Sequence, residues 1–238
     1  MLGAALIAWY VIVPHLGRTS QWPSILIVAL ILMPGMFGLS WLALPAWNHR
    51  RLLAACVVLL VLTLVLSSLG QDISSNFAKF ALMTAVGWWF LGLFEALSWV
   101  VAVAFLIPWV DAYSVWRGPT KAITTHHADV FSSLSVAFVA PGGGAARLGL
   151  PDILFFSVFL AASVRFRLRP LATWLSMTAS FGLTLVLATW LELDGLPALP
   201  GVALGFLLPN ADLLWRRLRR QPRIGDGTEV ALDRPADD

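Results

Sequence analysis

Residues 52–69 read LLAACVVLLVLTLVLSSL, a stretch without a single charged side chain. A helix needs roughly 20 predominantly apolar residues to cross the hydrocarbon layer of a membrane. This stretch therefore predicts a membrane-spanning helix. It contains Cys56, the only cysteine of the chain, so an internal disulfide is excluded and the thiol is interpreted as a small buried apolar group.

The composition of the whole chain agrees with this interpretation. Of 238 residues, 59% are hydrophobic and 12% are charged, and the mean hydropathy is +0.81. A soluble domain would carry about twice that charged fraction. Lipid must therefore solvate many of the apolar side chains. The basic residues form short clusters at the ends of apolar segments, so nucleic-acid binding is not expected.

Seven further segments have the composition of membrane helices. They are residues 2–17, 22–46, 77–94, 96–116, 150–166, 170–191 and 196–215. The first is short and has no basic residue ahead of it, so it is interpreted as a retained helix and not as a cleaved signal peptide. The expected fold class is all-α, a polytopic transmembrane bundle of about eight crossing helices over residues 1–217. Residues 218–238 are expected to form a polar, disordered tail.

The orientation follows from the arginines and lysines that flank these segments. Ten of them fall on the side that would carry both termini, and five fall on the other side. The excess predicts a multi-pass protein of the cell membrane with its C-terminus in the cytoplasm. One long connection, Arg117 to Gly149, then faces outward. It contains SVAFVAP at 135–141, which predicts a short strand at the membrane surface, followed by glycines 142–144 as a turn.

Two carboxylates lie where a membrane penalises them. Asp111 is part of AFLIPWVDAYSVW, and Asp152 is near the start of the next crossing segment. One segment ends and the next begins on the same side, so both acids are expected at similar depth. Two facing carboxylates in an apolar pocket do not both ionise easily and would share one proton. Such a pair supplies a base and an acid. The structural alternative is that each aspartate caps a helix or pairs with an arginine at the membrane interface.

A third element shares their side of the membrane. The last crossing segment opens with Pro197, Ala198, Leu199 and Pro200. Two prolines three residues apart prevent a regular helix start, and irregular backbone at membrane depth is tolerated where it lines a cavity. We therefore expect this opening beside the two acids.

These residues resemble the presenilin and signal peptide peptidase type of intramembrane aspartyl protease, in a prokaryotic form. That family pairs Tyr-Asp on one helix with Gly-x-Gly-Asp on the next, and a Pro-Ala-Leu motif opens its last helix. The corresponding residues here are Val110-Asp111, Gly149-Leu150-Pro151-Asp152 and Pro197-Ala198-Leu199. The resemblance covers about residues 96–215. Val110 stands where the family has tyrosine, and Pro151 stands where it has the second glycine. The family usually has nine helices, of which the eight expected here would be the last.

The resemblance implies that Asp111 and Asp152 are the catalytic pair of an endopeptidase. Gly149, Leu150, Pro151, Pro197, Ala198 and Leu199 would shape the site, and neither a cofactor nor a metal would be needed. The orientation is that of signal peptide peptidase and is inverted relative to presenilin. Partners would be the lipid bilayer and the transmembrane segments of membrane-protein substrates or signal-peptide remnants, cleaved within their helices.

Other functions stay open at this level. A prepilin-peptidase-like aspartyl protease also uses Gly-x-Gly-Asp, although the Pro-Ala-Leu opening argues against it. A non-catalytic relative, or a carrier that relays protons through Asp111 and Asp152, is the non-enzymatic alternative, but no paired halves are seen. His126, His127 and Asp129 are interpreted as a solvated loop and not as metal ligands. Asp212 precedes Arg216 by four residues, which predicts an ion pair within one helix.

Overall fold

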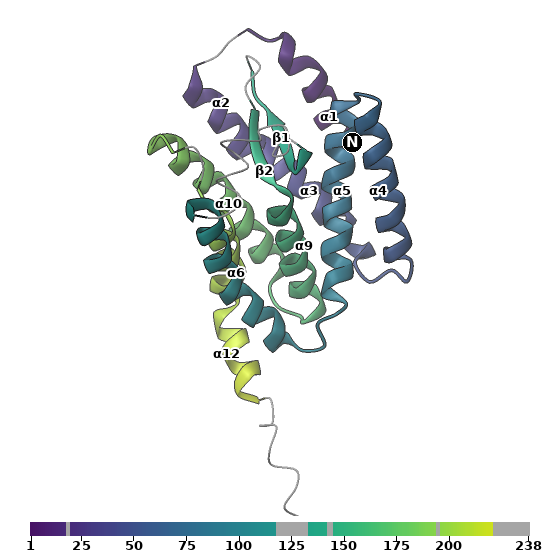
Figure 1. The fold of residues 1–238 in the computed structure, drawn as a ribbon. Coiled ribbons are helices and arrows are strands. Elements are labelled where there is room, and N and C mark those ends of the chain that lie inside the picture. Colours follow the sequence, from purple (N-terminus) through teal and green to yellow (C-terminus); the bar gives the residue numbers. More distant parts are fainter. Residues whose placement is uncertain (18–19, 118–132, 142–144, 194–195, 221–238) are drawn as a thin grey trace, which may run out of the picture.

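The computed structural model describes residues 1–17, 20–117, 133–141, 145–193 and 196–220, and it is mostly helical (Figure 1). Its longer helices are α1 (Leu2–Ile12), α2 (Gln21–Ile27), α3 (Met33–Ala43), α4 (Leu52–Ser68), α5 (Asp72–Leu91), α6 (Leu97–Arg117), α9 (Leu150–Arg165), α10 (Pro170–Trp190), α11 (Leu199–Leu207) and α12 (Ala211–Arg220). Short helical turns extend or join them at Val13–His15, Val28–Leu32, Leu44–Ala46 and Leu208–Asn210. Two strands, β1 (Ser135–Val139) and β2 (Ala145–Gly149), form one antiparallel hairpin.

In the described part of the chain, three helical segments are long and apolar enough to cross a membrane. They are Gln21–Ala46, Leu97–Ser114 and Pro170–Trp190; Leu2–His15 and Leu52–Ser68 are shorter apolar helices. The outer face of α4 presents exposed leucines and valines such as Leu53, Val58 and Leu64. Contiguous apolar surface of this kind is unusual for a protein surrounded by water. These features indicate a membrane protein, while the expectation of about eight crossings stays a prediction.

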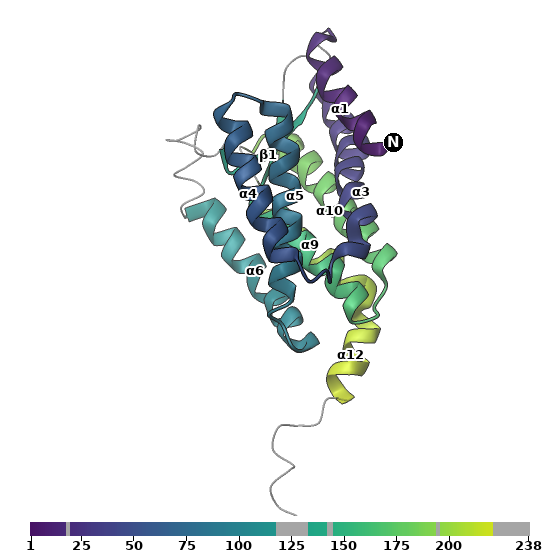
Figure 2. The same ribbon diagram turned by 90° about the vertical axis from the view of Figure 1, so that its right-hand side faces the viewer.

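A tight connection makes α4 and α5 antiparallel neighbours. Gly70 adopts a φ of +68°, the left-handed conformation that glycine tolerates best. The amide of Gln71 then donates a hydrogen bond to the carbonyl of Leu66 at 2.9 Å, which satisfies one of the last carbonyls of α4. Helix α4 lies at the edge of the molecule and packs against α5, and α5 packs in turn against α9 (Figures 1 and 2).

The centre of the bundle is built from aromatic side chains and close helix contacts. The ring of Phe37 on α3 lies 4.1 Å from that of Phe156 on α9 and 4.9 Å from that of Phe181 on α10. Gly87 brings α5 so near to α9 that a Cβ atom there would lie 2.6 Å from the carbonyl oxygen of Leu154. Small residues at crossings allow such close approach of helix backbones. The first turns of α9 are therefore fixed against α5.

The hairpin lies at the end of the bundle where α9 begins (Figure 1). The predicted strand within 135–141 is present as β1, which pairs with β2 in the register Ser135 to Gly149 and Val139 to Ala145. Val136 and Phe138 are fully buried, and β2 continues directly into α9. The glycines predicted to form the turn lie outside the described residues.

Some predicted boundaries differ from those of the structure. Helix α5 begins at Asp72, five residues before the predicted segment 77–94, because Ser75 and Asn76 are buried in the bundle and not exposed at its surface. The last helical segment extends to Arg220, past the predicted start of the polar tail at 218, and residues 221–238 lie outside the description. Asp212 pairs with Arg169, at 2.7 Å between Oδ1 and Nη1, in place of the predicted partner Arg216.

Candidate active site

Asp111 lies near the C-terminal end of α6. Pro108 is inside this helix three residues earlier. A proline in a helix interior removes one backbone hydrogen bond and disturbs the preceding turn. Asp111 is half-buried, whereas the neighbouring Val110 and Tyr113 are 59% and 66% exposed. Val110, at the position where the resemblance would expect tyrosine, is therefore an exposed residue.

The carboxylate of Asp111 contacts the Pro-Ala-Leu segment directly. Its Oδ2 atom accepts a hydrogen bond from the backbone N–H of Leu199 at 3.0 Å, and the backbone of Ala198 also interacts with it. Leu199 is the first residue of α11, and its N–H is one of the four that a helix start leaves without an intrahelical acceptor. Asp111 thus caps α11 from a different helix. Pro197 and Ala198 are half-buried beside this contact, and the Leu199 side chain is buried.

Asp152 lies in the first turn of α9. Its Oδ2 atom accepts a hydrogen bond from the backbone N–H of Gly149 at 3.1 Å, so the carboxylate also caps its own helix. Leu150 donates its N–H to the carbonyl of Leu134 at 3.1 Å, which ties the helix start to the hairpin. Pro151 is the second helical residue and costs no hydrogen bond there. Its presence in place of the family glycine is compatible with this local backbone.

Helices α6 and α9 both pack against α11 and contact each other, so Asp111 and Asp152 lie on neighbouring helices. Asp111 comes from the end of α6, Asp152 from the start of α9, and Leu199 from the start of α11. These helix ends meet at the same end of the bundle, under the hairpin (Figure 1). The structure thus brings together the three motifs that are 41 to 88 residues apart in the chain. Of two neighbouring carboxyl groups, the ionised one can act as a general base and the protonated one as a general acid.

The hairpin above the acids is clamped by side chains of α1 and α5. Asn76 binds both backbone groups of Ala137: its Oδ1 accepts the N–H at 2.7 Å, and its Nδ2 donates to the carbonyl at 2.9 Å. The hydroxyl of Tyr10 donates to the same carbonyl at 2.6 Å, and the indole of Trp9 donates to the carbonyl of Val139 at 3.1 Å. Asn76 therefore imitates a neighbouring strand along the outer edge of β1.

The sequence alone did not point to this clamp. Asn76 directly precedes the predicted segment 77–94, and no sequence motif singles it out. Its burial, at 8% exposure, was the missing information.

The clamp on β1 limits where a further strand can pair with the hairpin. In an antiparallel pair, the backbone groups of opposed residues point either toward each other or away to opposite edges. Because the backbone N–H and carbonyl of Ala137 point outward to Asn76, further strand pairing is restricted to the edge of β2.

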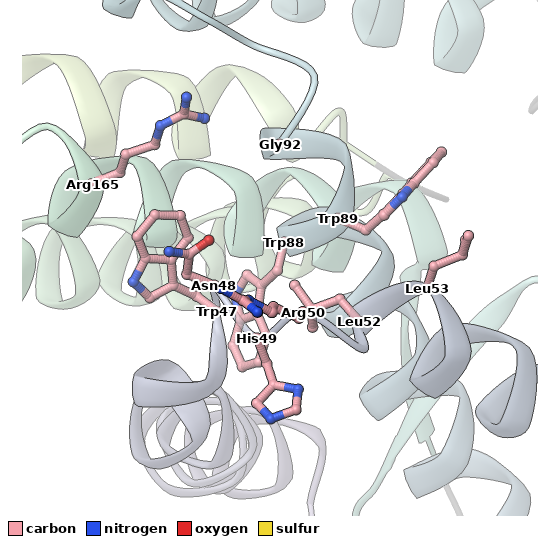
Figure 3. A pocket seen from close by; sticks show the side chains of 10 residues that line it. All are labelled: Trp47, Asn48, His49, Arg50, Leu52, Leu53, Trp88, Trp89, Gly92 and Arg165. Atoms are coloured by element: carbon pink, nitrogen blue, oxygen red, sulfur yellow. The ribbon is translucent and has the colours of Figure 1, made fainter.

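Two cavities occur elsewhere in the molecule. One of about 460 Å³ lies at the far ends of α5 and α9 and is bordered by the connection between α3 and α4 (Figure 3). Another of about 760 Å³ follows the groove between α3, α4 and α5. Neither is bordered by Asp111 or Asp152.

Among the described residues, no three His, Cys, Asp or Glu side chains are grouped to hold a metal ion. His126, His127 and Asp129 lie outside those residues.

Comparison of the sequence with protein-family models and with curated proteins finds no significant match. The resemblance to intramembrane aspartyl proteases therefore rests on the three short motifs and on their meeting in space.

Proposed function

We propose that this chain is an intramembrane aspartyl endopeptidase with Asp111 and Asp152 as its catalytic pair. The observation that carries the proposal is the hydrogen bond from the Leu199 N–H to Asp111 Oδ2, which joins α6 to the start of α11, while Asp152 lies in the first turn of the neighbouring helix α9. Helix capping by one carboxylate would not require a second acid beside it. The meeting of both acids with the Pro-Ala-Leu segment is what a protease of this type requires.

In the proposed reaction the pair holds one proton. The ionised carboxylate takes a proton from water, whose oxygen attacks the carbonyl carbon of the scissile peptide bond. The protonated carboxyl donates its proton to the nitrogen of the leaving amine, and the carbon–nitrogen bond breaks. The proton taken from water restores the shared-proton state. Water supplies the new hydroxyl of the acid product and the hydrogen of the amine, so the reaction needs no other reactant.

The proposed substrate is a single transmembrane helix that unwinds locally beside the acids. An unwound segment has free backbone groups, and pairing along β2 would hold them in an extended form. The last residue of β2, Gly149, also donates its N–H to Asp152. A strand bound there would therefore lie next to the reacting pair. The proposal includes about eight crossings and a cytoplasmic C-terminus, which place the acids toward the outer face of the cell membrane.

A purely structural role for the two aspartates is the competing proposal, and a specific observation favours it: each carboxylate accepts a hydrogen bond at a helix start. Asparagine separates the two roles. Its amide oxygen caps a helix about as well as a carboxylate oxygen, but it neither exchanges a proton at neutral pH nor activates water.

The experiment uses the purified protein in detergent with a reporter that carries one transmembrane helix. We expect Asp111→Asn and Asp152→Asn each to lose at least about 100-fold in cleavage rate, the usual contribution of acid–base catalysis, without change in thermal stability. Asp72→Asn is the matched control, because Asp72 also lies in the first turn of a helix but is exposed and outside the pair. Cleavage that persists in either of the first two variants contradicts the proposal.

An inhibitor provides an independent check. A peptide isostere with a hydroxyl group in place of the scissile carbonyl imitates the tetrahedral intermediate of an aspartyl protease. It should block cleavage by the wild-type protein in proportion to its occupancy. Cleavage that resists the isostere would indicate a contaminating protease of another class.

A further inference from the structure

Two arginines are among the residues that line the cavity of about 460 Å³ (Figure 3). Arg50 and His49 come from the connection between α3 and α4, and Arg165 comes from the end of α9. The residues that line this cavity include no carboxylate. Arg165 is held in place because its Nη1 atom donates to the carbonyl of Leu91 at 2.7 Å, which leaves its other N–H groups for further contacts. The cavity is therefore suited to an anion.

Tryptophans border the same cavity. Trp47, Trp88 and Trp89 are among its lining residues. Tryptophan is enriched at the level of the lipid headgroups, where its ring meets both apolar and polar surroundings. The cavity also lies at the ends of α5 and α9, which is where a membrane-embedded bundle would meet the headgroup layer. Its anion is thus expected at the membrane surface.

An apolar groove continues from this cavity. The second cavity, of about 760 Å³, shares His49, Leu52 and Trp88 with the first and is otherwise lined mainly by apolar side chains. It follows α5 from Trp88 back to Phe77, a distance of roughly 16 Å at 1.5 Å per residue. The hydrocarbon core of a bilayer is about 30 Å thick, so the groove has the depth of one leaflet.

We propose that these joined cavities bind one anionic phospholipid. Its phosphate would occupy the first cavity beside Arg50, and one acyl chain would lie in the groove along α5. Charge complementarity selects an anionic head, and the apolar continuation selects a lipid over a free phosphate ion. Zwitterionic lipids are disfavoured, because their headgroup brings a cation toward two arginines. The site is at the opposite ends of α5 and α9 from the two aspartates and does not rest on the proposed proteolysis.

Native mass spectrometry of the purified protein tests the head of the site. We titrate dioleoyl phosphatidylglycerol and dioleoyl phosphatidylcholine and compare the lipid adducts. The wild type should retain phosphatidylglycerol at least about tenfold more tightly than phosphatidylcholine, and Arg50→Gln should weaken phosphatidylglycerol by about tenfold, the effect of one lost charge-assisted hydrogen bond. Arg216→Gln, at an exposed arginine outside the cavity, is the matched control and should bind like the wild type. Equal binding of the two lipids, or equal loss in both variants, overturns the proposal.

A second pair of variants tests the groove. Ala55 lines the groove on α4, whereas Val61 is exposed on the same helix outside it. Ala55→Phe should weaken phosphatidylglycerol binding several-fold, and Val61→Phe should leave it unchanged. Glycerophosphoglycerol, which is phosphatidylglycerol without its acyl chains, should bind at least about 100-fold more weakly than the lipid, because burial of each methylene adds about 0.8 kcal/mol. Headgroup binding as tight as that of the lipid would overturn the assignment of the groove.

Discussion

At the scale of single residues, the candidate site depends on backbone atoms as much as on side chains. Leu199 contributes its N–H to Asp111, and Gly149 contributes its N–H to Asp152. The sequence motifs identified these positions but not the atoms that act. From the sequence, Leu199 could be interpreted as a packing residue and Gly149 as part of a turn. Only the structure shows that both motifs supply donors to the two acids.

Asn76 is the residue on which the position of the hairpin depends. Asn76→Ala would remove both bonds to Ala137 and leave its N–H without the acceptor Oδ1, while the Tyr10 hydroxyl would still donate to its carbonyl. We expect a loss of about 2 kcal/mol in the free energy of unfolding, in the range found for unsatisfied buried polar groups. Thermal unfolding in detergent measures the loss, and hydrogen exchange should show faster exchange of the Ala137 amide.

Ser68→Ala is the control for this prediction. The hydroxyl of Ser68 makes only a local, exposed bond to the carbonyl of Val65, so its removal should change stability by less than about 0.5 kcal/mol. An Asn76→Ala protein with unchanged stability and unchanged exchange at Ala137 would show that β1 is held mainly by its buried side chains.

At the scale of elements, long apolar helices were the easiest features to predict. Each of the eight predicted segments coincides with a helical run, because a long apolar stretch leaves few alternatives. Strand β1 was also predicted, because SVAFVAP is an apolar stretch too short to cross the membrane as a helix. Strand β2 was not, since AARLG has neither alternation nor β-branched residues and is a strand only because it pairs with β1. The Arg169–Asp212 pair was missed because it joins residues 43 apart.

The contact between α5 and α9 gives a prediction at this scale. Gly87→Ala would place a methyl group 2.6 Å from the Leu154 carbonyl oxygen, closer than any real contact, so the two helices must separate. We expect a loss of about 1–3 kcal/mol, as for other overpacked cores. Because Leu154 is two residues after Asp152, cleavage of the reporter should fall together with the thermal midpoint.

Gly3→Ala is the matched change in another helix. Its new methyl group would meet only Leu39, at 3.9 Å, and alanine is the better helix former. Its thermal midpoint should equal or exceed that of the wild type. A Gly87→Ala protein as stable as this control would mean that the helices adjust without strain.

At the scale of the whole molecule, the distribution of basic residues predicts which end faces the cytoplasm. Replacing the only cysteine, by Cys56→Ala, provides a background for labelling with a membrane-impermeant maleimide in intact cells. Gln71→Cys lies at the end of the bundle that carries the acids and should react from outside. Asn48→Cys lies at the opposite end and should react only after the membrane is permeabilised. Both positions are exposed. The reverse pattern would invert the proposed topology.

The side-chain clamp on β1 has a consequence for how copies of the protein coexist in a crowded membrane. The unpaired edge of a strand is where different protein molecules can pair and aggregate into larger sheets. Here the outer edge of β1 is already occupied by hydrogen bonds from Asn76, Tyr10 and Trp9. The hairpin can pair with a further strand at the edge of β2 alone. The hairpins of neighbouring molecules therefore cannot join into a continuous sheet.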